Sequence, residues 1–264
     1  MTTTPILMYH ALSPARTHRF QRWTLSGERL RDHLAFLRHT GYRSVTVAEL
    51  LDCHGRGGPA PGDRLVALTF DDGYADFHAV ALPLLVRFGL TATLFVPAGC
   101  VGGRSAWMEH EGEGDRPVLS WAALAEVADC GIEIGAHSYT HPEMDRLRAP
   151  ELARQAARPK AELEDHLGVL ISDFAYPYGR YDRRVRDAVA AAGYRGACTM
   201  NSWAATAGSH PLELPRTPIF HDTDTASLVA RLAGARRPAR RAALRAKHAA
   251  ESWAQTRRGR PAES

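Results

Sequence analysis

The chain contains the stretch Leu65-Val66-Ala67-Leu68-Thr69-Phe70-Asp71-Asp72-Gly73, in which an apolar run leads directly into two carboxylates and a glycine. The run predicts a buried strand, and Gly73 permits a sharp turn after it. Adjacent residues at a strand end point in different directions, so one carboxylate can bind a metal while the other faces a substrate. A simple turn is the alternative interpretation of this stretch alone.

A second polar group follows another apolar run. Residues 132–136 predict a strand, and His137-Ser138-Tyr139-Thr140-His141 comes directly after it. If this loop turns helically, His137 and His141 face the same way, and with one carboxylate they form a ligand set for zinc or iron. Two surface histidines are the alternative for this motif alone. Both motifs follow strands, however, and the carboxyl ends of barrel strands are where chemistry is found.

Short apolar runs alternate with longer amphipathic ones, which is typical of an α/β protein. The expected strands are 6–9, 44–46, 65–70, 91–96, 132–136, 173–176, 196–199 and 214–219. The expected helices are 26–39, 79–88, 120–129, 151–167 and 183–192, and Pro159 should kink or split the fourth. These units predict a distorted, incomplete (β/α) barrel of about seven strands, with an open doubly wound sheet as the alternative. Segments 55–63 and 102–117 are expected to be surface loops.

Charge is distributed unevenly along the chain. The 264 residues carry a formal net charge of +4, but residues 231–264 alone carry +8 and the preceding 230 carry −4. We therefore expect a catalytic barrel over residues 1–230 and a basic, Arg- and Ala-rich C-terminal tail over residues 231–264. Nucleic-acid binding is not expected, because only Trp253 interleaves the basic residues with an aromatic ring.

Targeting signals and cysteine patterns are inconspicuous. No run approaches the roughly 18 apolar residues of a membrane span. Neither a basic n-region nor a long apolar h-region precedes residues 6–9, so we expect no signal peptide and a cytoplasmic location. The four cysteines are widely spaced without a C-x-x-C pair, which predicts scattered, buried free thiols.

Taken together, these motifs resemble those of the polysaccharide deacetylases of carbohydrate esterase family 4. Thr69–Gly73 is similar to the first family motif, His137–His141 to the second, and Phe174–Gly179 to a variant of the third. Met8-Tyr9-His10 and Ala81-Leu82-Pro83 are similar to the branch whose motif order is permuted. The resemblance covers about residues 6–232. It implies a distorted (β/α) barrel that removes acetyl groups from N-acetylated sugars, with an N-acetylated glycan as the partner.

The resemblance also implies roles for individual residues. Asp72, His137 and His141 would bind a divalent metal, with Zn²⁺ the best match to the ligand types. Asp71 would be the general base. Tyr178 would line the site, and its backbone N–H would support the oxyanion.

The chain departs from the family pattern at two places. Ala175 stands where the third motif usually has an arginine, and we assign the missing role, a charge pair that orients Asp71, to Arg216. The usual element carrying the general-acid histidine is not evident. His10 is similar to its counterpart in the permuted branch and is our choice, and His221 is the competitor.

Aromatic residues near the motifs are candidates for sugar contact. Trp107, Trp121 and Tyr139 offer planes that suit the C–H faces of pyranoses, with core packing as the alternative, and Trp107 is the best candidate. Tyr178 is also expected to contact the substrate. Two other functions stay open at this point: hydrolysis of a small non-glycan amide, and carbohydrate binding without catalysis.

Overall fold

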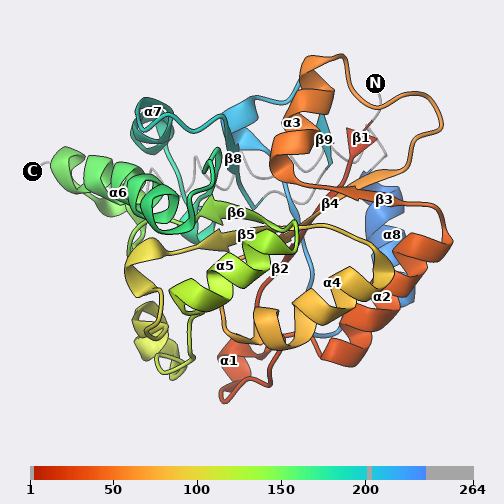
Figure 1. Cartoon of the computed structure of the whole chain (residues 1–264), viewed down its shortest axis with the longest axis horizontal. Helices are drawn as coiled ribbons and strands as arrows, with labels where there is room; N and C mark the ends of the chain where they lie inside the picture. Colours follow the sequence, from red (N-terminus) through yellow and green to blue (C-terminus); the bar gives the residue numbers. More distant parts are fainter. Residues whose placement is uncertain (1–2, 201–203, 236–264) are drawn as a thin grey trace, which may run out of the picture.

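A sheet of parallel strands forms the centre of the molecule in the computed structural model, which describes residues 3–200 and 204–235 (Figure 1). The strands are β2 (Ile6–Tyr9), β3 (Arg43–Val45), β4 (Leu65–Phe70), β5 (Thr93–Val96), β6 (Glu133–Ala136), β7 (Asp173–Ala175), β8 (Gly196–Cys198) and β10 (Thr217–Pro218). Their order is β10-β2-β4-β5-β6-β7-β8, and β3 pairs with the first half of β4. The predicted distorted, incomplete barrel is confirmed.

The gap in the barrel is spanned by one irregular segment. Leu214 forms an isolated parallel bridge to Cys198 of β8, whereas Thr217 and Pro218 of β10 pair with β2. The expected strand 214–219 is therefore divided, because its two ends bond to different neighbours. Arg216 lies between these two attachments.

Helices surround the sheet (Figure 1). The structure contains α1 (His18–Gln21), α2 (Gly27–His39), α3 (Val47–Gly55), α4 (Leu82–Phe88), α5 (Trp121–Asp129), α6 (Ala149–Leu167), α7 (Arg183–Ala191) and α8 (Thr225–Ala235). Contacts join α2 to α4 and α8, and α6 to α5 and α7. Side chains of Ser26, Thr46 and Ser120 accept hydrogen bonds at the starts of α2, α3 and α5, which fixes where these helices begin.

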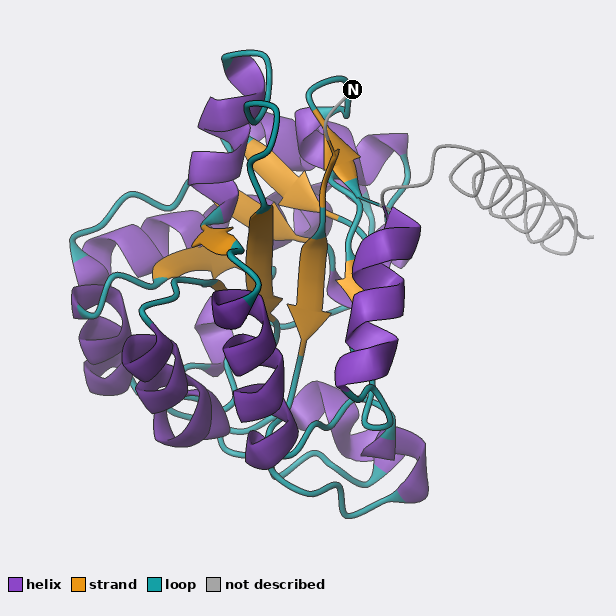
Figure 2. Cartoon of the chain, turned by 90° about the vertical axis from the view of Figure 1, so that its right-hand side faces the viewer, coloured by secondary structure: helices purple, strands orange, loops and turns teal. Residues whose placement is uncertain are grey.

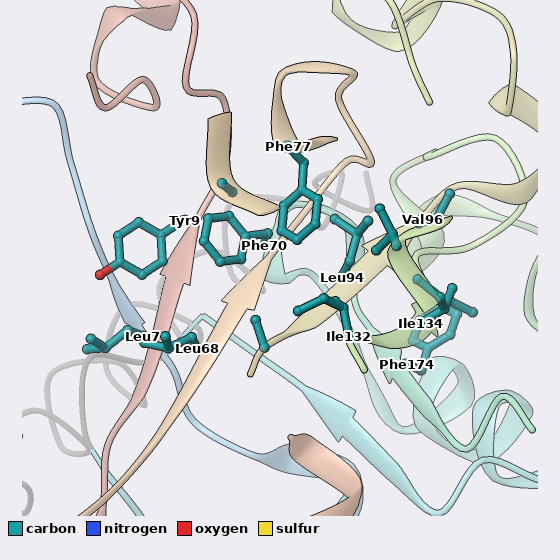
Figure 3. Close-up of a cluster of buried hydrophobic side chains, with 14 of the residues drawn as sticks. Leu7, Tyr9, Leu68, Phe70, Phe77, Leu94, Val96, Ile132, Ile134 and Phe174 are labelled. Atoms are coloured by element: carbon teal, nitrogen blue, oxygen red, sulfur yellow. The ribbon is translucent and has the colours of Figure 1, made fainter. Parts of the chain in front are cut away.

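Both faces of the central strands are buried, as expected for a parallel sheet. Alternate strand residues point outward into the main cluster beneath the helices, and Figure 3 shows Tyr9, Phe70 and Leu94 among them. The intervening residues, such as Ile6, Ala67 and Phe95, form a second cluster on the other face. A small antiparallel sheet of β1 (Thr3–Thr4) and β9 (Ala205–Thr206) lies close to the amino end of β2.

Three local expectations need correction. Helix α6 is continuous through Pro159, so the expected split is wrong, and the proline ring is buried with Leu152 and Leu163 on the packed face. Expected helix 79–88 begins instead with a π-helical turn, Phe77–Ala81, followed by α4. Segment 102–117 is not a plain surface loop, because it contains the 3-10 turn η3 (Ala106–Glu111) and has buried side chains.

The remaining expectations concern the tail, the thiols and the membrane. Residues 231–235 continue α8, and the rest of the expected tail, residues 236–264, lies outside the described residues. All four cysteines are free, as predicted, but only Cys198 is buried, so the expected burial is wrong for the other three. Within residues 3–200 and 204–235, no helix has both the length and the apolar character needed to cross a membrane.

Candidate active site

The carboxyl ends of the parallel strands carry the chemically important side chains. Figure 2 shows the long central strands running toward the same, loop-rich end of the molecule. Asp71 and Asp72 follow β4, His137 follows β6, and His10 follows β2. The sheet therefore brings together groups that lie up to 127 positions apart in the sequence.

Strained backbone marks the same place. In the described part of the chain, only four residues other than glycine have a positive φ: Asp72 at 74°, Ser138 at 61°, His141 at 60° and Tyr178 at 57°. Such conformations cost of the order of 1–3 kcal/mol each and persist only where the surrounding structure enforces them. All four lie in the loops that form this site, which is where functional constraint is expected to hold strain.

Asp72, His137 and His141 converge on one point. The Oδ1 atom of Asp72 lies 3.4 Å from Nε2 of His137 and 3.2 Å from Nε2 of His141, and the two Nε2 atoms are 3.2 Å apart. All three residues are buried. They form the group among the described residues whose ligand atoms lie close enough together to hold a metal ion.

The protonation of this triad suits a cation. The Nδ1 atom of His137 lies 2.8 Å from the carbonyl oxygen of Ala175, so Nδ1 carries the proton and Nε2 keeps a free lone pair. Burial alone would raise the pKa of Asp72, but the two adjacent imidazoles hold it well below the ordinary value. An ionised carboxylate and a neutral imidazole nitrogen are ligands that divalent metals require.

The second carboxylate has a different partner. Arg216 donates from its two terminal nitrogens to the two oxygens of Asp71, at 2.6 and 2.7 Å, and from Nε to the carbonyl oxygen of Thr199 at 3.1 Å. Both members of the pair are buried. Burial would raise the pKa of Asp71, but the guanidinium outweighs it and lowers that pKa. Asp71 is thus ionised, fixed in orientation and outside the triad.

His10 lies near Asp71. Its Nε2 atom is 4.0 Å from Oδ2 of Asp71, and its ring tilts against Trp23 with centroids 4.7 Å apart. Burial lowers the pKa of His10, while the nearby Asp71 and Asp72 carboxylates act in the opposite direction. His221 is exposed and lines a separate pocket beside the start of α2. The structure therefore brings His10, and not His221, to Asp71.

A cavity of about 490 Å³ opens above these groups. Both aspartates and both triad histidines line it, together with Tyr178, whose ring is edge-on to His141 with centroids 4.6 Å apart. Other lining residues come from the segments 19–23 and 108–111, and Met200 adds a further one.

The other aromatic candidates, Trp107, Trp121 and Tyr139, do not line the cavity. Trp107 is partly buried and stacks on His141, with ring centroids 5.0 Å apart and 29° between the planes, and it is not part of the cavity lining. The ring of Tyr139 packs against Gly99 and under the guanidinium of Arg158 at 3.9 Å. The structure therefore does not bring Tyr139 to the cavity.

Supporting residues were missed in the sequence. Gln155 of α6 accepts hydrogen bonds from the backbone N–H groups of Tyr139 and Thr140, at 2.9 and 3.0 Å, and so holds the loop that bears both histidines. Trp23 packs on His10 from a loop that no motif marked. Neither role has a spacing signal, because each depends on a partner distant in the sequence.

Comparison with known proteins places this geometry in context. The sequence profile described as polysaccharide deacetylase matches residues 58–197, more than half of the chain. The Bacillus subtilis (strain 168) protein YxkH is 27% identical over 204 residues, covering 76% of this chain and 66% of that protein. The poly-beta-1,6-N-acetyl-D-glucosamine N-deacetylase of Escherichia coli (strain K12) is 31% identical over 121 residues, covering 42% of this chain and 17% of the enzyme. The chain thus spans less than two thirds of the length of these two curated relatives.

Solved structures share the architecture. IcaB from Ammonifex degensii superposes with a TM-score of 0.73 at 27% identity, covering 89% of this chain and 97% of that one. The Streptococcus pyogenes deacetylase PplD superposes with a TM-score of 0.75 at 24% identity, covering 88% and 98% of the two chains. The second likeness concerns the fold alone.

Proposed function

Because the chain belongs to the polysaccharide deacetylase family, we propose that it hydrolyses the acetamide group of N-acetylated sugars in a glycan, releasing acetate and leaving a free amine. The observation that carries the proposal is the contrast between two adjacent carboxylates. Asp72 faces two imidazole nitrogens, whereas Asp71 is held by Arg216 outside that group. A hydrolytic site needs this division between a metal ligand and a free base.

We infer that Asp72, His137 and His141 hold a divalent cation, with Zn²⁺ the best match to one carboxylate and two imidazoles. Their burial, their convergence and the free Nε2 lone pair of His137 support this assignment. When bound, such a cation polarises the acetamide carbonyl and acidifies a water molecule.

Proton transfers fall to residues of the chain. The carboxylate of Asp71 accepts the proton of the attacking water, because Arg216 keeps it ionised and oriented. His10, with Nε2 4.0 Å from Asp71, donates a proton to the amide nitrogen as the carbon–nitrogen bond breaks. The backbone N–H of Tyr178 supports the oxyanion, and a donor of this kind is worth about 3 kcal/mol. The products are acetate and a protonated sugar amine.

The substrate assignment is drawn from the relatives. The Escherichia coli relative is named for poly-beta-1,6-N-acetyl-D-glucosamine, which makes N-acetylglucosamine oligomers the first substrates to test. We expect the purified, metal-loaded protein to release acetate from these oligomers and to lose that activity in a chelator.

The decisive test combines metal analysis with the acetate assay. Wild-type protein should contain close to one divalent ion per chain, and Asp72→Ala should contain almost none and release no acetate. His78→Ala, at a partly exposed position on the turn before α4, is the matched control and should behave as wild type. Acetate release from a small acetamide but from no sugar oligomer would overturn the substrate assignment.

A further inference from the structure

The two histidines of the triad are held in different ways. His137 is oriented by a hydrogen bond from its Nδ1 to the carbonyl oxygen of Ala175. The Nδ1 atom of His141 is buried and has no hydrogen-bond partner among the described residues. An imidazole that ligates a metal usually has its second nitrogen bonded to an oxygen, which sets the direction of the ring. For His141, some other contact has to set that direction.

Aromatic rings supply that contact. The indole of Trp107 stacks on the imidazole of His141, with 5.0 Å between centroids and 29° between planes. Tyr178 meets the same imidazole edge-on at 4.6 Å and 75°. Trp107 itself stacks on Tyr74, with 6.3 Å between centroids and 24° between planes. The His141 ring is therefore confined by packing where His137 is confined by a hydrogen bond.

The loop that presents Trp107 is firmly anchored. Glu113 is fully buried and accepts hydrogen bonds from the backbone N–H groups of Arg16, at 2.6 Å, and Thr17, at 2.8 Å. Its other oxygen pairs with Nε of Arg116 at 2.7 Å. The guanidinium of Arg116 continues to the side chain of Ser13 at 2.8 Å. The ion pair between Glu113 and Arg116 is buried, and both of its members also bond to the loop before α1, so it ties segment 102–117 to that loop.

Backbone contacts complete the anchor. Ser105 donates to the carbonyl oxygen of Arg116 at 3.0 Å, and Met108 donates to that of Ser105 at 2.8 Å, on either side of Trp107. The indole therefore has little freedom to move away from His141. A rigid neighbour fixes a ring more effectively than a mobile one. A mobile side chain loses conformational entropy when the contact forms, whereas an anchored one has little left to lose.

We propose that Trp107 is a positioning residue that orients the imidazole of His141 toward the metal site, in place of the outer hydrogen bond that His141 lacks. The inference deepens the function proposed above and rests on its metal site. It replaces the sequence expectation that Trp107 contacts the sugar. Loss of an outer partner of a metal-ligating histidine typically weakens metal binding by about 10–100-fold.

The chain offers a matched control for this proposal. Trp121, the first residue of α5, also stacks on a histidine, His166, with centroids 4.0 Å apart and 12° between planes. Neither of these residues contributes to the triad or to the cavity lining. Replacing Trp121 therefore removes a tryptophan–histidine stack of similar chemistry without touching the site.

The experiment measures Zn²⁺ affinity by competition with a chromophoric chelator, using full-length protein freed of metal. Trp107→Leu keeps an apolar side chain but removes the ring, and we expect it to weaken Zn²⁺ binding by about 10-fold or more. Trp107→Phe restores a ring and should stay within about 3-fold of wild type. Trp121→Leu should bind as wild type. Thermal unfolding of each metal-free variant checks that it is folded.

The outcomes separate this inference from the proposed function. If wild-type protein binds no Zn²⁺, the metal site itself is wrong and the proposed function fails with it. If wild type binds but Trp107→Leu binds equally well, the positioning role alone is refuted. The same conclusion follows if Trp107→Phe is as weak as Trp107→Leu, or if Trp121→Leu weakens binding to the same extent.

Discussion

Glu133, the first residue of β6, makes the stability of this protein depend on pH in a way that one substitution can reveal. Its Oε2 atom accepts hydrogen bonds from the backbone N–H of Val47 at 2.9 Å and the hydroxyl of Thr93 at 2.6 Å. Burial, followed by the nearby carboxyl of Asp173, raises the pKa of Glu133 from 4.5 to about 8. We therefore expect Glu133 to be protonated in the folded protein at neutral pH.

The sign and size of the effect follow from linkage. A raised pKa in the folded state means that the folded protein holds a proton that the unfolded chain releases. The stabilisation that this bound proton gives the folded protein is fully present below pH 4.5 and is lost as the pH rises through about 8. Between these values the free energy of unfolding falls by at most about 1.4 kcal/mol per pH unit, the limit for one proton.

Glu133→Gln is the substitution that isolates the contribution of Glu133 to the pH dependence of the free energy of unfolding. The amide keeps an oxygen for the hydrogen bonds from Val47 and Thr93 and supplies N–H donors toward Asp173, so it imitates the protonated acid. We expect its free energy of unfolding to lose the dependence on pH that Glu133 causes. Relative to wild type, the variant should gain at least about 1 kcal/mol between pH 5.5 and 7.5.

Urea denaturation at half-unit steps from pH 5 to 8.5 provides the measurement. Glu28→Gln, at an exposed position on α2, is the control and should track wild type. Parallel curves for wild type and Glu133→Gln would refute the reasoning, because they would show that Glu133 does not take up a proton on folding. Acetate release should survive in Glu133→Gln, because this residue lies at the amino end of its strand, away from the candidate site.

Three further predictions concern the site. Asp71→Asn should keep its metal and lose about 10²–10⁴-fold in kcat, whereas Asp72→Ala should lose the metal; a metal-loaded Asp71→Asn with near-normal rates would contradict the assignment of the base. His10→Ala should lower kcat by about 10²–10⁴-fold and His221→Ala should not, and a larger loss in His221→Ala would reverse the choice of general acid. Arg216→Met should cost about 3–5 kcal/mol in urea denaturation at neutral pH, because it leaves the buried carboxylate of Asp71 unpaired, and an unchanged midpoint would show that Asp71 finds another partner.

The strands were the most predictable part of the fold. Residues 6–9 and 65–70 became β2 and β4 with the same bounds, because unbroken apolar runs of this length can be buried on both faces only in the centre of a sheet. The two-residue strands β1 and β9 carry no such signal. Their pairing joins Thr3 to Thr206, and contacts this distant depend on the finished fold.

Placement of the site residues was predictable for a related reason. A motif that directly follows a buried strand is delivered to the carboxyl edge of the sheet whatever the loop does next, which locates Asp71, Asp72 and His137. Tyr139 lies within the second motif, yet its side chain points to Gly99 and Arg158, because the positive φ of Ser138 turns the chain immediately before it. Backbone turns of this kind are not encoded in the spacing of residue types.

Three of the carboxyls in this barrel, those of Asp71, Asp72 and Glu133, are accommodated by three different means, and the difference explains which of them can do chemistry. Isolated ionised carboxylates are too costly to bury, so each needs a counter-charge or a proton. Asp71 has a guanidinium, Asp72 has two imidazoles, and Glu133 has a proton. Only the first two are ionised at neutral pH. Asp72 is directed at the imidazole nitrogens, which leaves Asp71 as the carboxylate beside the triad that lines the cavity and is able to accept a proton from water.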